Sequence, residues 1–274
     1  MKISYSPYKL RGIEGAILKV QEREHCGYSD IFPLPQLGDP PLKSLLADQK
    51  ALLWKRSLHF ALLDMEAQKM GESISIKLPR CHQLIDSMTQ VPTQSISKVK
   101  VGICCDSEIN WLKKHFSSSK TKLRLDFNLR LSRDSFLSYL EAIKSVLPQI
   151  EFIEDPYPFN PGLWEADQDK YHVPFALDYA SEKGIGLNNA APVLILKPLR
   201  QEDEPFLSAV KGGQKVIVTS CRDHEIGQWL AAFSAARFPE HITGIFSEGT
   251  PQQIPEGLGF GFEKLVQGLR WYSC

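Results

Sequence analysis

Ionisable side chains recur at the ends of short β-branched runs in this sequence. They are Lys98, Lys100, Asp126, Glu154, Asp178 and Lys197. Consecutive members are about one strand-plus-helix unit apart, so five successive strands would present charge at one level of a barrel. Because side chains alternate between the faces of a strand, Lys98 and Lys100 share a face, as do Arg124, Asp126 and Asn128. The pattern therefore predicts that these charges point into a common interior.

Three of these groups are carboxylates, and no histidine or thiolate accompanies them. Burying converging charges costs several kcal/mol for each ion unless the charges are paired or hold a metal. An all-oxygen ligand set favours a hard cation, and Mg²⁺ is preferred because it keeps positions open for water and substrate. A lysine beside a second cation and a metal should have a lowered pKa, which a general base needs. The alternative is a set of structural ion pairs.

Seven runs that read as strands recur between residues 98 and 246, and helical stretches separate most of them. The predicted strands are 98–103, 123–127, 150–154, 173–178, 193–197, 215–219 and 242–246. Asp106, Ser132 and Asp223 are expected to cap three of the helices between them. This order favours parallel strands, and the number of units favours a closed barrel over an open doubly wound sheet. A weaker eighth strand is expected at 257–262.

Residues 1–92 have a different pattern. Ala16 to Val20 reads as a strand, and a Pro-rich loop follows at 31–41. A long helical segment runs from about Leu42 to Met70, with a break near Trp54, and Gly71 closes it. We therefore expect an α+β domain over 1–92 and a catalytic barrel over 93–258. The C-terminal segment 259–274 would return to the first domain or pack beside it.

The bulk composition excludes several classes of partner. The chain has 274 residues, 43% of them hydrophobic, and equal numbers of basic and acidic residues, 32 each. Without a net field, nucleic acid and membrane are not expected as partners, and a small molecule is the expected substrate. No apolar run is long enough for a membrane span or signal peptide. Six cysteines without CxxC spacing indicate reduced thiols in a cytoplasmic protein. The sequence leaves the oligomeric state open.

The ordered set Lys-x-Lys, Asp, Glu, Asp, Lys resembles the enolase superfamily, and within it the o-succinylbenzoate synthase branch of the muconate-lactonising-enzyme subgroup. The matching segments are 98–102, 123–128, 152–156, 175–178 and 194–198, with 57–71 resembling the helix that ends the family's N-terminal domain. The resemblance implies a (β/α)7β barrel, a modified TIM barrel, with an N-terminal α+β capping domain. It also implies an Mg²⁺-dependent enzyme, with Mn²⁺ as a possible substitute.

The resemblance implies a carbon–oxygen lyase that dehydrates SHCHC (2-succinyl-6-hydroxy-2,4-cyclohexadiene-1-carboxylate) to o-succinylbenzoate in menaquinone biosynthesis. Asp126, Glu154 and Asp178 would bind the metal, which in turn would bind the substrate carboxylate. The lysines would carry the syn elimination. Lys100 would remove the α-proton and later protonate the departing hydroxyl, Lys98 would lower the pKa of Lys100, and Lys197 would stabilise the enolate.

Further residues are candidates for substrate contact. Thr219 and Ser220 match the family's hydroxyl pair at the succinyl end of the substrate, although by position they could equally be turn or capping residues. Asn128 and Arg124 are further candidates, and Arg124 could instead support the metal carboxylates or pair with Glu154. The loop at 28–35 lies where the capping domain would close over the site, or is a plain connection. His224 is expected at the surface.

Other functions compete with this interpretation. An N-succinyl amino acid racemase, or another racemase or epimerase of the subgroup, would use the same two lysines. A dipeptide epimerase is disfavoured because residues 247–250 lack its Asp-x-Asp. A phosphate-binding barrel would want Gly-rich loops after its last strands. A catalytically silent relative would not need all six charges. Tyr179 follows Asp178 where the family often has Glu, so a supporting contact is in doubt.

Overall fold

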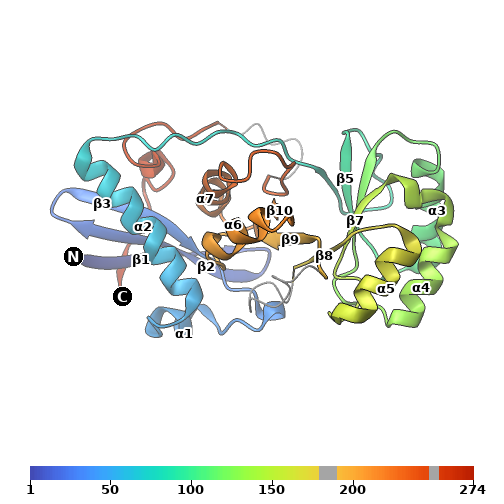
Figure 1. The fold of residues 1–274 in the computed structure, drawn as a ribbon. Helices are drawn as coiled ribbons and strands as arrows, with labels where there is room; N and C mark the ends of the chain where they lie inside the picture. The colour runs from blue at the N-terminus through green and yellow to red at the C-terminus, as the bar shows by residue number, and fades with distance from the viewer. Residues whose placement is uncertain (179–189, 247–252) are drawn as a thin grey trace.

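The computed structural model describes residues 1–178, 190–246 and 253–274 of the chain. Figure 1 shows two regions: an antiparallel sheet crossed by a long helix, and a curled parallel sheet with helices on its outer side. The expectations for Tyr179 and for 247–250 concern positions outside the described residues.

The N-terminal region is built around a four-stranded antiparallel sheet in the order β11-β1-β2-β3. Its strands are β1 (Lys2–Leu10), β2 (Ile13–Glu22), β3 (His25–Ile31) and β11 (Tyr272–Ser273). β11 pairs with β1 through Tyr5 and Tyr272, so the two ends of the chain lie side by side.

One long helix packs on this sheet. The predicted helical segment is divided into α1 (Leu42–Ala47) and α2 (Leu52–Met70), so the break falls just before Trp54. Gly71 closes α2 in the left-handed conformation, as predicted. The helix contacts β3 closely at Gly27, where an added Cβ would lie 2.0 Å from the Ala61 carbonyl oxygen. Only glycine allows this approach.

The second region is a seven-stranded parallel sheet in the order β10-β9-β8-β7-β6-β5-β4. Its strands are β4 (Gln83–Ile85), β5 (Ile96–Lys100), β6 (Lys122–Asp126), β7 (Ile150–Glu154), β8 (Phe175–Leu177), β9 (Val193–Leu196) and β10 (Lys215–Val218). Isolated bridges join Thr219 to Gly244 and Thr243 to Cys81. The segment at 243–244 therefore lies between the two edge strands, which confirms the predicted barrel.

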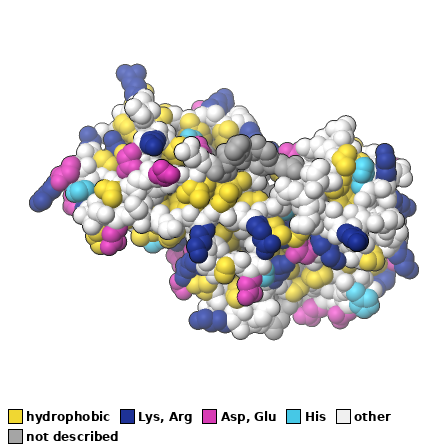
Figure 2. All heavy atoms as spheres, turned by 90° about the horizontal axis from the view of Figure 1, so that it is seen from above, with side chains coloured by type: hydrophobic (Ala, Val, Ile, Leu, Met, Phe, Trp, Pro, Cys, Tyr) yellow, Lys and Arg dark blue, Asp and Glu magenta, His cyan; other side chains and the backbone are white. Residues whose placement is uncertain are grey.

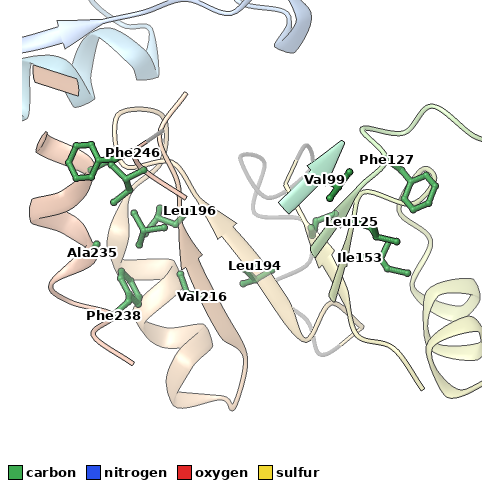
Figure 3. Close-up of a cluster of buried hydrophobic side chains, with 14 of the residues drawn as sticks. Val99, Leu125, Phe127, Ile153, Leu194, Leu196, Val216, Ala235, Phe238 and Phe246 are labelled. Carbon is green, nitrogen blue, oxygen red and sulfur yellow. The ribbon is translucent and has the colours of Figure 1, made fainter. Parts of the chain in front are cut away.

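Helices cover the outer side of this sheet (Figure 1). They are α3 (Cys105–Phe116), α4 (Arg133–Ala142), α5 (Pro161–Tyr171), α6 (Asp203–Lys211) and α7 (Glu225–Ala235), with short 3-10 helices η1 (Pro35–Leu37), η2 (Lys144–Gln149) and η4 (Phe262–Lys264). Val99, Leu125 and Phe127 are fully buried on the helix side of their strands, as the alternation predicts (Figure 3). The charged neighbours on these strands must then face the barrel interior.

Several local predictions are wrong. The run at 257–262 is not a strand, because turns and η4 occupy it. Strand β4 was not predicted, since its three residues are too few to show an alternating pattern. Because β4 belongs to the barrel sheet, we propose that the division between the regions falls before it, earlier than residue 92. The remaining boundaries stay proposals.

One of the three predicted helix caps is confirmed, and two are wrong. Ser132 caps α4 by accepting the Ser135 N–H, as predicted. At α7 the cap is His224 rather than Asp223, with Nδ1 accepting the Ile226 N–H. His224 is therefore partly buried and structural, contrary to the expected surface position. At α3 the cap position is Cys104 rather than Asp106.

Acidic and basic side chains are interspersed over the face seen in Figure 2, as the balanced composition predicts. No helix among the described residues is long and apolar enough to cross a membrane.

Candidate active site

The strand register brings the predicted charges to one level. Lys100 is opposite Asp126, and Asp126 is opposite Glu154. Asp178 comes directly after β8, and Lys197 directly after β9. All of these side chains line one cavity of about 450 Å³ at the carboxyl ends of the strands. That end is where barrel enzymes carry their active sites.

Lys98 lies between two of the carboxylates. Its Nζ is 3.0 Å from Asp126 Oδ2 and 2.7 Å from Glu154 Oε1. Asp126 and Glu154 are each 3% exposed and Lys98 is 9% exposed, so the contacts are largely shielded from water. The amine therefore neutralises two neighbouring strands at once.

The other two lysines are placed differently. Lys197 forms an ion pair with Asp178 and is nearly buried. Lys100 is the most accessible of the three, with 41% of its side chain exposed, and its Nζ is 4.0 Å from Asp126 Oδ2. Lys100 and Lys197 thus reach the cavity from β5 and from the end of β9, with the carboxylate-bearing strands between them. This leaves Lys100 the freest to meet a ligand.

The charges shift one another's pKa values. Burial raises the pKa of Glu154 to about 7, and the charge of Asp126 adds to the increase. For Asp126, burial is outweighed by the charges of Lys98 and Lys100, which lower its pKa. Burial also lowers the pKa of Lys98, but Asp126 and Glu154 outweigh it and raise that pKa above the ordinary value. Lys98 is therefore held as a cation beside Lys100, because its neighbours are anions.

The donor chemistry of the cavity suits a hard cation. Three carboxylates line one wall, and the charges of Asp126 and Asp178 both raise the pKa of Glu154, so added positive charge would be favourable there. In the conformation described, however, Lys98 and Lys197 hold these carboxylates. Accordingly, no three His, Cys, Asp or Glu side chains within 1–178, 190–246 and 253–274 are spaced to share a metal ion. Binding one would require the carboxylates to turn from the lysines.

Comparisons show which known proteins this chain is similar to. Residues 3–67 match the family model described as the O-succinylbenzoate synthase N-terminal domain. The chain is 28% identical to an o-succinylbenzoate synthase of Bdellovibrio bacteriovorus over an alignment of 332 residues, which covers 100% of this chain and 98% of the relative. The predicted resemblance to the enolase superfamily is confirmed.

Solved structures show the same fold. A dipeptide epimerase from Enterococcus faecalis V583 superimposes with a TM-score of 0.75 at 16% identity, covering 95% of this chain and 98% of that one. An o-succinylbenzoate synthase from Thermosynechococcus elongatus BP-1, which carries Mg in its active site, gives 0.66 at 18% identity, covering 89% and 92%. At these identities the superpositions establish the fold alone.

Thr219 and Ser220 both line the cavity, but their hydroxyls differ. Ser220 Oγ donates to the Ile245 carbonyl at 2.7 Å and accepts the Arg222 N–H, so it is committed to the loop. Within the described part of the chain, buried Thr219 Oγ1 has no hydrogen-bond partner. A buried polar atom without a partner is costly. Of this pair, Thr219 is therefore the better placed to meet a substrate.

Arg124 and Asn128 support the site from outside and from its edge. Arg124 is 0% exposed and does not line the cavity; its Nε donates to Glu151 Oε2 at 2.7 Å and its Nη1 contacts His82 Nδ1. The suggested pairing of Arg124 with Glu154 is therefore wrong. Asn128 does line the cavity, and its backbone and side-chain amides both donate to Asp126 Oδ1. This arrangement orients Asp126.

The N-terminal region completes the cavity. Its outer wall is lined by Arg11 in the β1–β2 turn, by Ile13 at the start of β2, and by Leu34 and Leu37 around η1. The Pro-rich loop thus reaches the site, at its end near η1. The role of Arg11 was missed, because its partners lie more than 200 residues away in sequence and a lone arginine in a turn carries no local signal.

Proposed function

We propose that this chain is an o-succinylbenzoate synthase, a carbon–oxygen lyase that performs the Mg²⁺-dependent syn dehydration of SHCHC in menaquinone biosynthesis. The observation that carries the proposal is the placement of Lys100 and Lys197 on either side of three strand-end carboxylates in one cavity. Full-length similarity to the Bdellovibrio synthase supports the substrate. Six free cysteines support a cytoplasmic location.

Asp126, Glu154 and Asp178 would hold the Mg²⁺, or Mn²⁺ in its place, through carboxylate oxygens. When bound, the cation supplies positive charge for the substrate carboxylate and so increases the acidity of the adjacent C–H. Lys98 and Lys197 now compensate these carboxylates, and the cation would replace these contacts as the carboxylates turn toward it. The charge balance of the cavity thus suits an anionic substrate.

The proton transfers fall to the most accessible lysine. Lys100, as the neutral amine, takes the proton α to the substrate carboxylate, and the ammonium of Lys197 stabilises the resulting enolate from the opposite side. Lys100 then returns the proton to the departing hydroxyl on the same face. A C–H and a C–O bond break, a ring double bond forms and water leaves, so no oxidant is needed.

The substrate arm would lie along the loop after β10. Thr219 offers a buried hydroxyl there, while Ser220 shapes the turn. Asn128 and Arg124 act indirectly, through Asp126 and through the layer beneath the site. The partner is therefore a small-molecule carboxylate.

The direct test is to incubate purified protein with Mg²⁺ and SHCHC and to follow formation of the aromatic product by absorbance. We expect turnover that EDTA abolishes and Mg²⁺ restores. Absence of product in a folded, Mg²⁺-supplied sample would refute the synthase assignment. Activity that persists in EDTA would refute the metal dependence.

The alternative is an N-succinyl amino acid racemase or another racemase or epimerase of the subgroup. The observation that favours it is the same pair of lysines, which suits proton exchange from two sides. Incubating N-succinyl amino acids in D₂O would report it as α-deuterium incorporation. Exchange without dehydration of SHCHC would reverse the ranking of the two functions.

A further inference from the structure

Arginine side chains gather at the outer wall of the cavity. Arg11 comes from the β1–β2 turn, Arg130 from the loop after β6 and Arg222 from the loop after β10. Among the described lining residues, the carboxylates are the three at the strand ends, which already contact lysines. The outer wall therefore carries positive charge that these carboxylates do not offset.

The guanidinium of Arg11 is fixed across the junction of the two regions. Its Nη2 donates to the carbonyl oxygens of Cys221 at 3.0 Å and Arg222 at 2.5 Å. Its carbon also lies 5.8 Å from the centre of the Phe32 ring. These contacts hold the guanidinium at the cavity wall. Both hydrogen bonds to the carbonyl oxygens come from the same nitrogen, Nη2.

Arg11 and Arg222 also repel each other. Burial lowers the pKa of Arg11, and the charge of Arg222 lowers it further, while Asp223, Cys221 and Asp86 act in the opposite direction to a smaller extent. Arg222 pairs with Asp86 at 3.1 Å, but both partners are more than 40% exposed, so solvent screens that pair. An anion beside both guanidiniums would relieve the repulsion and would gain charge-assisted hydrogen bonds.

We propose that Arg11, assisted by Arg222, forms a subsite for the second, distal carboxylate of a dicarboxylate substrate. The inference rests on the proposed function, which places the first carboxylate at the strand ends. The loop from Thr219 to Arg222 runs from the proposed arm contact to this subsite, so one extended arm can reach both. The N-terminal region thereby recognises the negative charge at the far end of the substrate.

Calorimetric titration of two ligands in the presence of Mg²⁺ tests this inference. One ligand is o-succinylbenzoate, and the other is its methyl ester at the succinyl end, which lacks the distal charge. We expect the native protein to prefer the diacid. We expect Arg11→Gln to weaken diacid binding about tenfold and to leave ester binding nearly unchanged, since one charge-assisted contact is lost. Arg11→Lys, which keeps the charge, should lose less.

Arg23→Gln is the matched control. Arg23 occupies the β2–β3 turn of the same sheet with a similar left-handed backbone (φ 54° against 51° for Arg11), and it does not line the cavity. It should bind both ligands like the native protein. If Arg11→Gln left diacid binding unchanged, or weakened both ligands equally as a purely structural role would, the inference would fail. If the inference fails but the native protein converts SHCHC, the proposed function still holds. If the native protein does not convert SHCHC, the inference and the proposed function both fail.

Discussion

Among the described residues, acidic side chains are buried together at the barrel mouth and between the two regions, and these two clusters are stabilised differently. At the barrel mouth, Asp126 and Glu154 share the ammonium of Lys98. Between the two regions, Asp30 and Asp223 are also buried, but the contacts of Asp30 come from neutral groups. The Tyr8 hydroxyl donates to Asp30 Oδ1 at 2.7 Å, and the His224 N–H donates to Asp30 Oδ2 at 3.2 Å.

The surroundings of the junction cluster are tight. An added Cβ on Gly227 would lie 2.6 Å from Asp30 Oδ2 and 2.9 Å from Asp223 Oδ2. Among the residues that the structure describes, Asp223 Oδ1 has no hydrogen-bond partner. Burial and the charge of Asp223 raise the pKa of Asp30 well above its ordinary value. Burial likewise raises the pKa of Asp223 to about 7.

The difference shows how the two clusters can be used. Lysines offset the charge of the barrel-mouth cluster, which lies next to an open cavity where it can meet a cation and a substrate. Hydrogen bonds hold the junction cluster in a place without solvent, where a proton can be retained at low cost. We therefore expect changes at the mouth to affect catalysis and changes at the junction to affect stability.

The largest effect should follow removal of the proposed base. We expect Lys100→Ala to lower kcat by about 10²- to 10⁴-fold, because a positioned general acid–base contributes that much. Thermal unfolding should change little, since 41% of this side chain is exposed and its contact with Asp126 is long. Steady-state kinetics with SHCHC measures kcat. The control is Lys114→Ala, which changes an exposed lysine of α3. A fully active Lys100→Ala would contradict its role.

A smaller effect, on stability alone, is expected at the junction. Asp30→Ala would leave the partly buried Tyr8 hydroxyl and His224 N–H without their acceptor, at a cost of up to about 1–3 kcal/mol for each group. Asp30→Asn should retain most of the stability, because its amide can accept one hydrogen bond and donate another. Urea unfolding monitored by circular dichroism measures both. Equal losses in the two variants would contradict the explanation by hydrogen bonding.

The smallest effect concerns pH. The pKa of Asp223 is raised to about 7 from the model-peptide value of 3.8, so between these values the folded protein keeps a proton that the unfolded chain has lost. Its contribution to stability is therefore greatest below about pH 4 and falls as pH rises toward 7, by at most about 1.4 kcal/mol per pH unit. Asp223→Asn should remove this part of the slope. Urea titrations at pH 5, 6 and 7 test it, and parallel slopes for both proteins would rule it out.

The sequence predicted the barrel elements well because they carry strong local patterns. The buried strands β5, β6 and β7 are short runs in which apolar and charged residues alternate, and the ends of each were predicted to within three residues. Short elements are harder to predict from the sequence. The three residues of β4 show no pattern, and the glycine-rich run near Phe260 reads as a strand although it forms turns and η4.

By itself, the sequence determined which charges end the strands and, through alternation, that they face inward, because periodicity is a local property of the chain. Only the tertiary structure decided their partners. Lys98 bridges Asp126 and Glu154, Arg124 bonds to Glu151, and Arg11 reaches a loop 210 residues away. Such contacts depend on how strands and regions pack in three dimensions, and no local pattern encodes that packing.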